Sequence, residues 1–174
     1  MTYIRYTILL FCLCTPAKAD LIHSTVTSVY DGDTVTLATG DKIRLAGIDS
    51  PERKSGRWPE QPYAIAAGDF LRAQLLGKHV TVSWTKRDRY GRPVGKVYHR
   101  RVDQNWRMVD AGLAWHFKEY EAEQSERDRK RYATAHLRAR AKRAGLWADS
   151  GAIAPWDWRQ KGSARPLQNS EVSN

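Results

Sequence analysis

The chain has 174 residues, of which 41% are hydrophobic and 28% are charged. This length and balance predict one folded domain with a hydrophobic core, and they exclude a chain that is disordered throughout. A formal net charge of +10 indicates a polyanionic partner, although the same charge would serve solubility, and the absence of a strongly apolar helical face argues against an anionic membrane.

The first 19 residues have the pattern of a secretory signal peptide. Arg5 precedes an apolar run from Tyr6 to Cys14, and the small-residue site Ala17-Lys18-Ala19 follows. The run is shorter than the roughly 20 apolar residues of a membrane span. The alternative, an N-terminal core strand or helix, fits less well because the run has no periodicity. We therefore expect cleavage after Ala19 and export to the periplasm or the medium, with no membrane anchor.

Both cysteines, Cys12 and Cys14, lie in this predicted signal peptide. The residues before them are bulky, whereas a lipid-attachment site has small ones. The processed chain, residues 20–174, would have neither thiol nor disulfide, and a domain of this size folds without bridges. Loss of Arg5 and Lys18 would lower the formal charge from +10 to +8.

Alternation of apolar and polar residues predicts strands in the first half of the chain. Val35 and Leu37 alternate with threonines, the turn Thr39-Gly40-Asp41 follows, and residues 42–48 form the predicted returning strand. The segment 49–62 is a predicted loop because it holds three prolines and a glycine. Two further strands are predicted at residues 80–84 and 94–98, on either side of a turn at residues 88–92.

Three helices are predicted from spacing and end signals. Ala, Leu and Phe recur at helical spacing over residues 63–76, and Asn105 is the predicted N-cap of a short second helix. Residues 121–144 predict one long charged helix, or two, that ends at Gly145. The polar residues 159–174 predict a flexible tail.

The predicted order is three strands, a helix, two strands and two helices. Five short strands with helices at the corners and at the end are typical of a small barrel of the OB type. We therefore predict an α+β fold, a five-stranded OB-fold β-barrel with three α-helices, over residues 20–158.

Four carboxylates lie in two short motifs, Asp31-Gly32-Asp33-Thr34 and Asp49-Ser50-Pro51-Glu52. Asp33 begins one strand of the predicted hairpin and Asp49 follows the end of the other, so we expect them to meet at one end of the sheet. Clustered carboxylates repel one another unless a cation neutralises them. Their hard oxygens favour calcium or magnesium, and no histidine or cysteine pair has zinc spacing. Taken alone, the first motif would be an ordinary turn.

Two arginines belong to the same predicted region. Arg44 lies on the strand that leads to Asp49, and Arg92 closes the turn that begins at Asp88. Taken singly, each would be a salt-bridge partner. Beside a metal ion and a carboxylate that activates water, two guanidinium groups stabilise the charge on a pentacoordinate phosphate. The combination therefore indicates chemistry on a phosphate group.

Several motifs together resemble the thermonuclease (staphylococcal nuclease) family in order and spacing, over residues 21–158. They are Asp31 to Thr34, Arg44 to Glu52, Asp88 to Arg92, Asn105 with Met108-Val109, Gly112-Leu113-Ala114 and Gly145-Leu146-Trp147. The later Pro155-Trp156-Asp157-Trp158-Arg159 resembles a terminal motif of bacterial relatives. No single motif is decisive, but the ordered set with all its charged residues is specific. By this resemblance the chain is identified as a bacterial exported member of the family.

The resemblance implies an activity and a metal ion. The expected enzyme is a calcium-dependent endonuclease that hydrolyses DNA and RNA and leaves 3′-phosphate ends. The implied ligands of Ca²⁺ are the side chains of Asp33 and Asp49 and the backbone carbonyl of Ser50. The family usually has threonine or alanine at the position of Ser50, and serine serves equally because only the carbonyl binds.

The resemblance also implies catalytic and substrate-binding residues. Glu52 matches the carboxylate that orients the attacking water, and Arg44 and Arg92 match the two arginines that bind the phosphate. Arg92 is also expected to help the leaving group. The residues matched to the nucleotide pocket are Arg89, Tyr90 and Tyr120.

The sequence departs from the family pattern at three places. The loop at residues 53–61 differs in length and composition from that of the best-known member. His136 stands at a helical position where relatives usually have glutamate, which bears on helix packing and not on the predicted site. The stretch Trp115-His116-Phe117 leaves the aromatic wall of the pocket undefined.

Two alternative functions follow from the same residues. Asp33 with Glu52-Arg53-Lys54 also fits the loose D…[D/E]-x-K pattern of another nuclease class. That pattern would make Lys54 essential, leave Arg44 and Arg92 unexplained, and give 5′-phosphate ends. The second alternative is a catalytically silent OB-type nucleic-acid-binding module, which has no need of the ordered arginines and carboxylates. Under each of these hypotheses, the expected oligomeric state is a monomer.

Overall fold

The computed structural model describes residues 19–56 and 59–163. Of the expectations from sequence, the signal peptide up to residue 18 and the tail from residue 164 lie outside these described residues. Within the described part, no helix is both long and apolar enough to cross a membrane.

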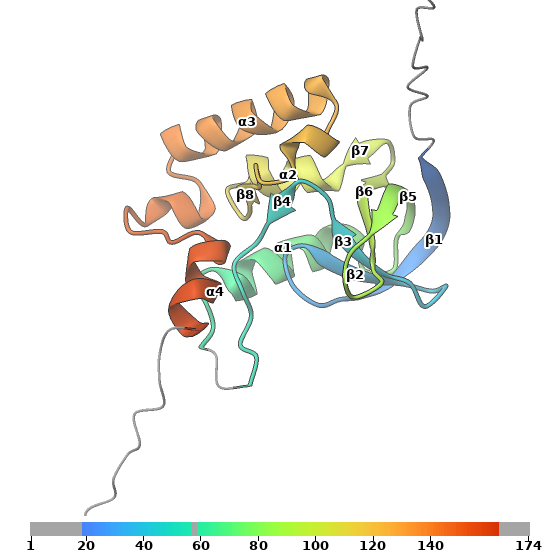
Figure 1. Ribbon diagram of the computed structural model, residues 1–174, viewed down its shortest axis with the longest axis horizontal. Helices are drawn as coiled ribbons and strands as arrows, with labels where there is room; N and C mark the ends of the chain where they lie inside the picture. Colours follow the sequence, from blue (N-terminus) through green and yellow to red (C-terminus); the bar gives the residue numbers. More distant parts are fainter. Residues whose placement is uncertain (1–18, 57–58, 164–174) are drawn as a thin grey trace, which may run out of the picture.

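The strands form a closed barrel, which lies on one side of the molecule in Figure 1. Five strands are joined in the order β3-β2-β1-β5-β6, and the parallel pairing of β3 with β6 closes the ring. They are β1 (Asp20–Val29), β2 (Thr34–Leu37), β3 (Lys42–Leu45), β5 (His79–Arg87) and β6 (Pro93–His99). β7 (Val102–Asp103) extends this sheet beside β6, and β4 (Ile48–Asp49) pairs separately with β8 (Trp115–His116).

The first strand is shared between the two halves of the barrel. Residues 20–25 of β1 pair with β5, and its later residues pair with β2 across a bulge between Val26 and Ser28. A bulge bends a strand and increases its twist, which lets β1 turn the corner of the barrel. The predicted α+β fold with a five-stranded OB-type barrel is confirmed.

Four α-helices and two short 3₁₀ helices complete the described part of the chain. They are α1 (Ala64–Leu75), α2 (Gln104–Asp110), η1 (Glu121–Glu123), α3 (Glu126–Ala141), η2 (Gly145–Ala148) and α4 (Pro155–Ser163). The long helix predicted at residues 121–144 begins later because Ser125 caps α3, accepting a hydrogen bond from the N–H of Asp128 at 3.1 Å.

The barrel core follows from the strand periodicity. Val26, Ile43 and Val97 are fully buried, and the residues that alternate with them face outward. Helix α1 packs against this core through Leu71 and Leu75. Each such side chain contributes about 1.5–3 kcal/mol when it is fully buried. The barrel is therefore a firm support for the residues at its rim.

The strand predicted over residues 42–48 is divided by a turn at Ala46 and Gly47. The φ angle of Gly47 is 71°, and a Cβ atom there would lie 1.7 Å from Nε2 of Gln124. The positive φ angle favours glycine, whereas the amide of Gln124 is the end of a flexible side chain that can shift. The turn takes the chain out of the barrel and into β4, where Ile48 pairs with His116 of β8.

Helix α2 has a different N-cap from the predicted one. Asp103, and not Asn105, accepts the capping hydrogen bond at 3.0 Å. Asn105 is fully buried, its Oδ1 accepts from the N–H of Val97 at 3.0 Å, and its Nδ2 donates to the carbonyl of Ala46 at 3.0 Å. The amide of Asn105 therefore fixes the turn before β4 to strand β6.

The fourth α-helix was not predicted, and it alters the predicted end of the domain. The sequence predicts a flexible tail from residue 159, but α4 continues to Ser163. The Trp156 ring lies 6.4 Å from that of Trp115 and 5.4 Å from that of Phe117, measured between centroids. These aromatic contacts hold α4 against the β8 segment, which local sequence patterns do not reveal.

Candidate active site

The two aspartates predicted to bind metal lie together at one end of the barrel. Asp33 directly precedes β2 and Asp49 ends β4, and their exposed fractions are 2% and 1%. Arg44 of β3 joins them, because one terminal nitrogen contacts Oδ1 of Asp33 and the other lies 2.5 Å from Oδ1 of Asp49. The expectation that these carboxylates meet is confirmed, although Asp49 belongs to the short β4 and not to a loop after the hairpin.

Ser50 and Gly32 bring the two acidic motifs into contact. The N–H of Ser50 donates to Oδ2 of Asp33 at 2.7 Å. A Cβ atom at Gly32 would lie 2.7 Å from the Cβ atoms of both Ser50 and Ala67 of α1. Glycine therefore permits the close approach of this turn to α1 and to the second motif. The first motif is thus part of the packing of the site and not an isolated turn.

Asp31 supports the first motif from the side. Its Oδ1 accepts a hydrogen bond from the N–H of Asp33 at 3.0 Å. Burial raises the pKa of Asp31, against the attraction of Arg44 and the hydrogen bonds from Thr34. Asp31 consequently retains a proton more readily than an aspartate at the surface, which reduces repulsion within the carboxylate cluster.

Glu52 is held in place by Gln61. The N–H of Glu52 donates to Oε1 of Gln61 at 3.0 Å, and the N–H of Gln61 donates to the carbonyl of Glu52 at 2.9 Å. Nε2 of Gln61 donates to the carbonyl of Ile153 at 2.7 Å. Gln61 is 3% exposed, whereas about a third of the Glu52 side chain is exposed. The backbone of Glu52 is therefore fixed, and its carboxylate faces the solvent-accessible side of the site.

A third arginine reaches the site from the far end of the chain. Arg159 of α4 lies 2.8 Å from Oδ2 and 3.3 Å from Oδ1 of Asp49, and it also contacts Oε1 of Glu52. Burial alone would lower the pKa of Arg159, but its hydrogen bonds to Asp49 and Glu52 raise it. The guanidinium group is therefore charged and links a predicted metal ligand to the predicted general base.

Arg92 lies on the neighbouring turn between β5 and β6. Asp88 organises this turn, because its Oδ1 accepts from the N–H of Arg92 at 3.0 Å and its Oδ2 from Nε of Arg92 at 2.7 Å. Burial raises the pKa of Asp88, but these hydrogen bonds lower it overall. Arg44 pairs with Val94, two residues after Arg92. The turn thus stands beside the strand of Arg44, while Arg92 itself contacts Asp88 and not the two buried aspartates.

The residues predicted to line a nucleotide pocket lie on two segments. Tyr90 is 69% exposed, and the guanidinium carbons of Arg89 and Arg92 lie 5.0 and 5.4 Å from its ring centroid. Tyr120, just before η1, is 48% exposed, and Nζ of Lys86 lies 4.6 Å from its ring. Each tyrosine is an exposed face on which a base can stack. Among the described contacts, none joins the two tyrosines in one pocket.

The donor set suits a hard divalent cation. Asp33 and Asp49 offer carboxylate oxygens, and Ser50 is the adjoining source of a backbone carbonyl, the kind of ligand that calcium takes. Within residues 19–56 and 59–163, no three His, Cys, Asp or Glu side chains group closely enough to hold a metal. An ion between Asp33 and Asp49 would therefore depend on carbonyl and water oxygens for its remaining ligands.

A known protein family matches the part of the chain that contains most of these site residues. The model of the family described as "Staphylococcal nuclease homologue" matches residues 42–149. This range includes Arg44, Asp49, Glu52 and Arg92. The chain belongs to the staphylococcal nuclease family.

Relatives of this staphylococcal nuclease homologue match beyond the family range. A protein of Escherichia coli O157:H7 named "Uncharacterized endonuclease" is 35% identical over 160 residues, covering 88% of this chain and 95% of the relative. One of the same name in Haemophilus influenzae is 31% identical, covering 88% of this chain and 82% of the relative. The "Staphylococcal-like nuclease CAN1" of Arabidopsis thaliana is 36% identical, covering 82% of this chain but 42% of the longer plant protein.

Three residues that hold this nuclease-family site were not assigned to it from the sequence. By sequence, Arg159 belongs to a terminal motif, Gln61 to a predicted loop, and Asn105 to a predicted helix cap. Their partners lie up to 110 positions away in the chain.

Proposed function

We propose that this protein is a calcium-dependent endonuclease that hydrolyses phosphodiester bonds of DNA and RNA and leaves 3′-phosphate ends. The observation that carries the proposal is the convergence of Asp33, Arg44, Asp49 and Glu52 at one end of the barrel. Family membership and relatives named as nucleases support the reaction class. The choice of calcium and the product ends rest on the resemblance of the motifs.

In the proposed reaction, water attacks phosphorus and the bond to the 5′ oxygen breaks. Glu52 orients this water and accepts its proton, which suits a carboxylate whose backbone is fixed and whose side chain is about one third exposed. Arg44 and Arg92 bind the phosphate and stabilise its added negative charge. A bound Ca²⁺ would neutralise phosphate oxygens while Asp33, Asp49 and the carbonyl of Ser50 hold it.

Arg92 has two terminal nitrogens available for a phosphate, whereas those of Arg44 already contact carboxylates. The ion pair with Asp88 uses Nε of Arg92, so its two terminal nitrogens remain for the substrate, and the leaving 5′ oxygen would receive a hydrogen bond from them. Arg44 orders the two buried aspartates with its terminal nitrogens, and about a fifth of its side chain is exposed toward solvent. The arginines thus connect the metal ligands with the place where the substrate would lie.

The protein is further proposed to act as an exported monomer after removal of residues 1–19. The apolar run with its small-residue site supports export, and the positive charge supports a polyanionic substrate. The substrate would be nucleic acid in the periplasm or the medium.

Cleavage assays in defined metal ions test this proposal. The purified protein is incubated with plasmid DNA and with RNA in calcium, in magnesium and in EDTA, and the product ends are labelled. We expect degradation of both polymers in calcium only, with 3′-phosphate ends. Magnesium-dependent cutting with 5′-phosphate ends would instead support the Asp33 … Lys54 pattern. Salt-dependent binding without cleavage in any metal would support the silent binding module.

A further inference from the structure

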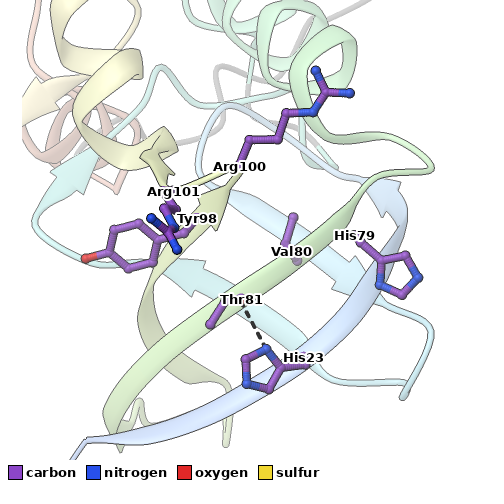
Figure 2. A pocket seen from close by; sticks show the side chains of 7 residues that line it. All are labelled: His23, His79, Val80, Thr81, Tyr98, Arg100 and Arg101. Atoms are coloured by element: carbon purple, nitrogen blue, oxygen red, sulfur yellow. Dashed lines mark hydrogen bonds between the residues drawn. The ribbon is translucent and has the colours of Figure 1, made fainter.

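A basic hollow of about 460 Å³ lies on the outer face of the barrel, away from the site described above. Figure 2 shows it across strands β1, β5 and β6. The residues that line it are His23, His79, Val80, Thr81, Tyr98, Arg100 and Arg101. None of these lining residues is acidic, so the hollow offers cationic and hydrogen-bonding groups to an anion.

The strand register builds the floor of this hollow. His23 of β1 is paired with Thr81 of β5, and Thr81 is paired with Tyr98 of β6, so the three side chains form a row across the sheet. Nδ1 of His23 lies 3.0 Å from Oγ1 of Thr81. His79 lies two residues before Thr81 on the same face. The row therefore places an imidazole, a hydroxyl and a phenol side by side.

Two arginines form the rim at the turn between β6 and β7. Arg100 and Arg101 have φ angles of 49° and 64°, both in the left-handed region. A two-residue hairpin turn of this kind favours Asn-Gly, and a non-glycine residue there costs on the order of 1 kcal/mol or more. Neither arginine forms an ion pair with any carboxylate of the described residues. The strained turn therefore presents two exposed guanidinium groups that have no ion-pair partner among the described residues.

The hollow and the active site lie at opposite ends of β6. Arg92 stands just before this strand and Arg100 just after it. Eight residues at about 3.3 Å each separate them by roughly 25 Å along the strand. A single nucleotide cannot span that length, but an extended strand of several nucleotides can. The second site would consequently act only on longer substrates.

We propose that this hollow is a second contact site for the phosphate backbone of a nucleic-acid strand whose scissile bond lies at the active site. The inference rests on the proposed nuclease function for the identity of the polymer. Arg100 and Arg101 bind phosphates, His23 and Thr81 supply hydrogen bonds, and Tyr98 offers a ring for a base. Contacts of this kind follow the backbone and do not read sequence.

The double substitution Arg100→Asn with Arg101→Gly tests the proposal without threatening the fold. Asn-Gly is the favoured pair for this turn, so we expect the melting temperature to stay the same or rise. Binding of a single strand of about 20 nucleotides is measured by fluorescence anisotropy in EDTA, between about 50 and 200 mM salt. We expect about tenfold weaker binding at the lower salt concentration. The slope of log affinity against log salt should shrink by about 1.4, roughly 0.7 for each lost phosphate contact.

Activity on substrates of two lengths gives the second readout. The variant should cleave a dinucleotide substrate as fast as the wild type does, but its KM for long single strands should rise about tenfold. The control, Arg127→Gln with Lys142→Gln, removes two exposed charges from the α3 region and should have less effect on binding. An equal loss of affinity in the control would overturn the proposal, because the effect would then be one of net charge.

Two other results would overturn the second site. Unchanged binding and KM in the Asn-Gly variant of an active nuclease would reject the hollow while leaving the proposed function intact. Loss of binding to phosphatidylglycerol vesicles, with unchanged binding to DNA, would assign the hollow to a membrane surface instead. Absence of both binding and cleavage in the wild-type protein would reject the nuclease function and the second site together.

Discussion

Asp49 contacts two arginines in the site. Arg44 lies 2.5 Å from its Oδ1 and Arg159 lies 2.8 Å from its Oδ2, while 1% of the residue is exposed. Breaking one side of such a buried ion pair leaves a charge uncompensated. A metal ion that binds Asp49 must therefore displace or share at least one of these guanidinium groups. Of the two, Arg159 is the more exposed.

We expect the variant Arg159→Gln to bind Ca²⁺ about tenfold more tightly than the wild type does. The change removes a competing cation, and tenfold corresponds to about 1.4 kcal/mol, the size of one hydrogen bond to a charged group. Calorimetric titration with Ca²⁺ alone measures this without substrate. Arg127→Gln removes an exposed positive charge from α3 and is the control. Equal or weaker affinity in Arg159→Gln would show that Arg159 does not compete with the ion.

At the scale of elements, Glu52, Gln61 and α4 act as one unit. Gln61 is hydrogen-bonded to Glu52 and to the carbonyl of Ile153, just before α4, and Arg159 of α4 contacts Glu52 again. The ring contacts of Trp156 attach α4 to β8, which pairs with β4. The C-terminal helix therefore supports the same short strand that carries Asp49.

The packing of α3 predicts a pH-dependent stability. His136 of α3 lies 4.8 Å from Trp147 between ring centroids, and its Nδ1 accepts from the N–H of His116 at 3.5 Å. Burial lowers the pKa of His136 to about 4, with repulsion from Arg140, His116 and Lys118 adding to it. The unfolded chain has the ordinary pKa of about 6.5, so it binds the proton more readily than the folded state does.

The free energy of unfolding should therefore decrease as the pH falls from about 6.5 to about 4. We expect His136→Gln to reduce that loss, by an amount on the order of 2 kcal/mol. Urea denaturation of both proteins at the two ends of this pH window measures the difference. His23→Gln, a change of an exposed histidine on β1, is the control. An identical pH dependence for wild type and His136→Gln would contradict the assignment.

Local patterns and long-range contacts explain which elements were predictable. The β2–β3 hairpin and α1 follow from periodicities of two and 3.6, and Asp33 and Asp49 meet because a hairpin brings its ends together. The turn that divides the strand at Ala46 and Gly47 is held by Asn105, which lies far along the chain and donates to the carbonyl of Ala46. The place of α4 depends on tertiary ring contacts. These features require the assembled fold, so no local pattern contains them.

At the scale of the whole molecule, the barrel separates two regions that differ in their charged residues. The rim with Asp33, Asp49 and Glu52 concentrates negative charge that arginines balance. The opposite end of β6 has a basic hollow and a strained arginine turn. With a formal charge of +8 after the proposed loss of Arg5 and Lys18, long-range attraction would bring a polyanion to the surface before specific contacts form. Under the two proposals, chemistry would be localised at one end and strand binding would extend to the other.

The central claim is that this rim is the active site of a nuclease, and one substitution tests it most directly. The initial rate of plasmid cleavage in calcium is measured for the wild type, for Glu52→Gln and for Glu126→Gln, an exposed control on α3. Loss of one acid–base group should lower the rate of Glu52→Gln by about 10²–10⁴-fold, with an unchanged melting temperature, while the control keeps the wild-type rate. Wild-type cleavage by Glu52→Gln would contradict the claim.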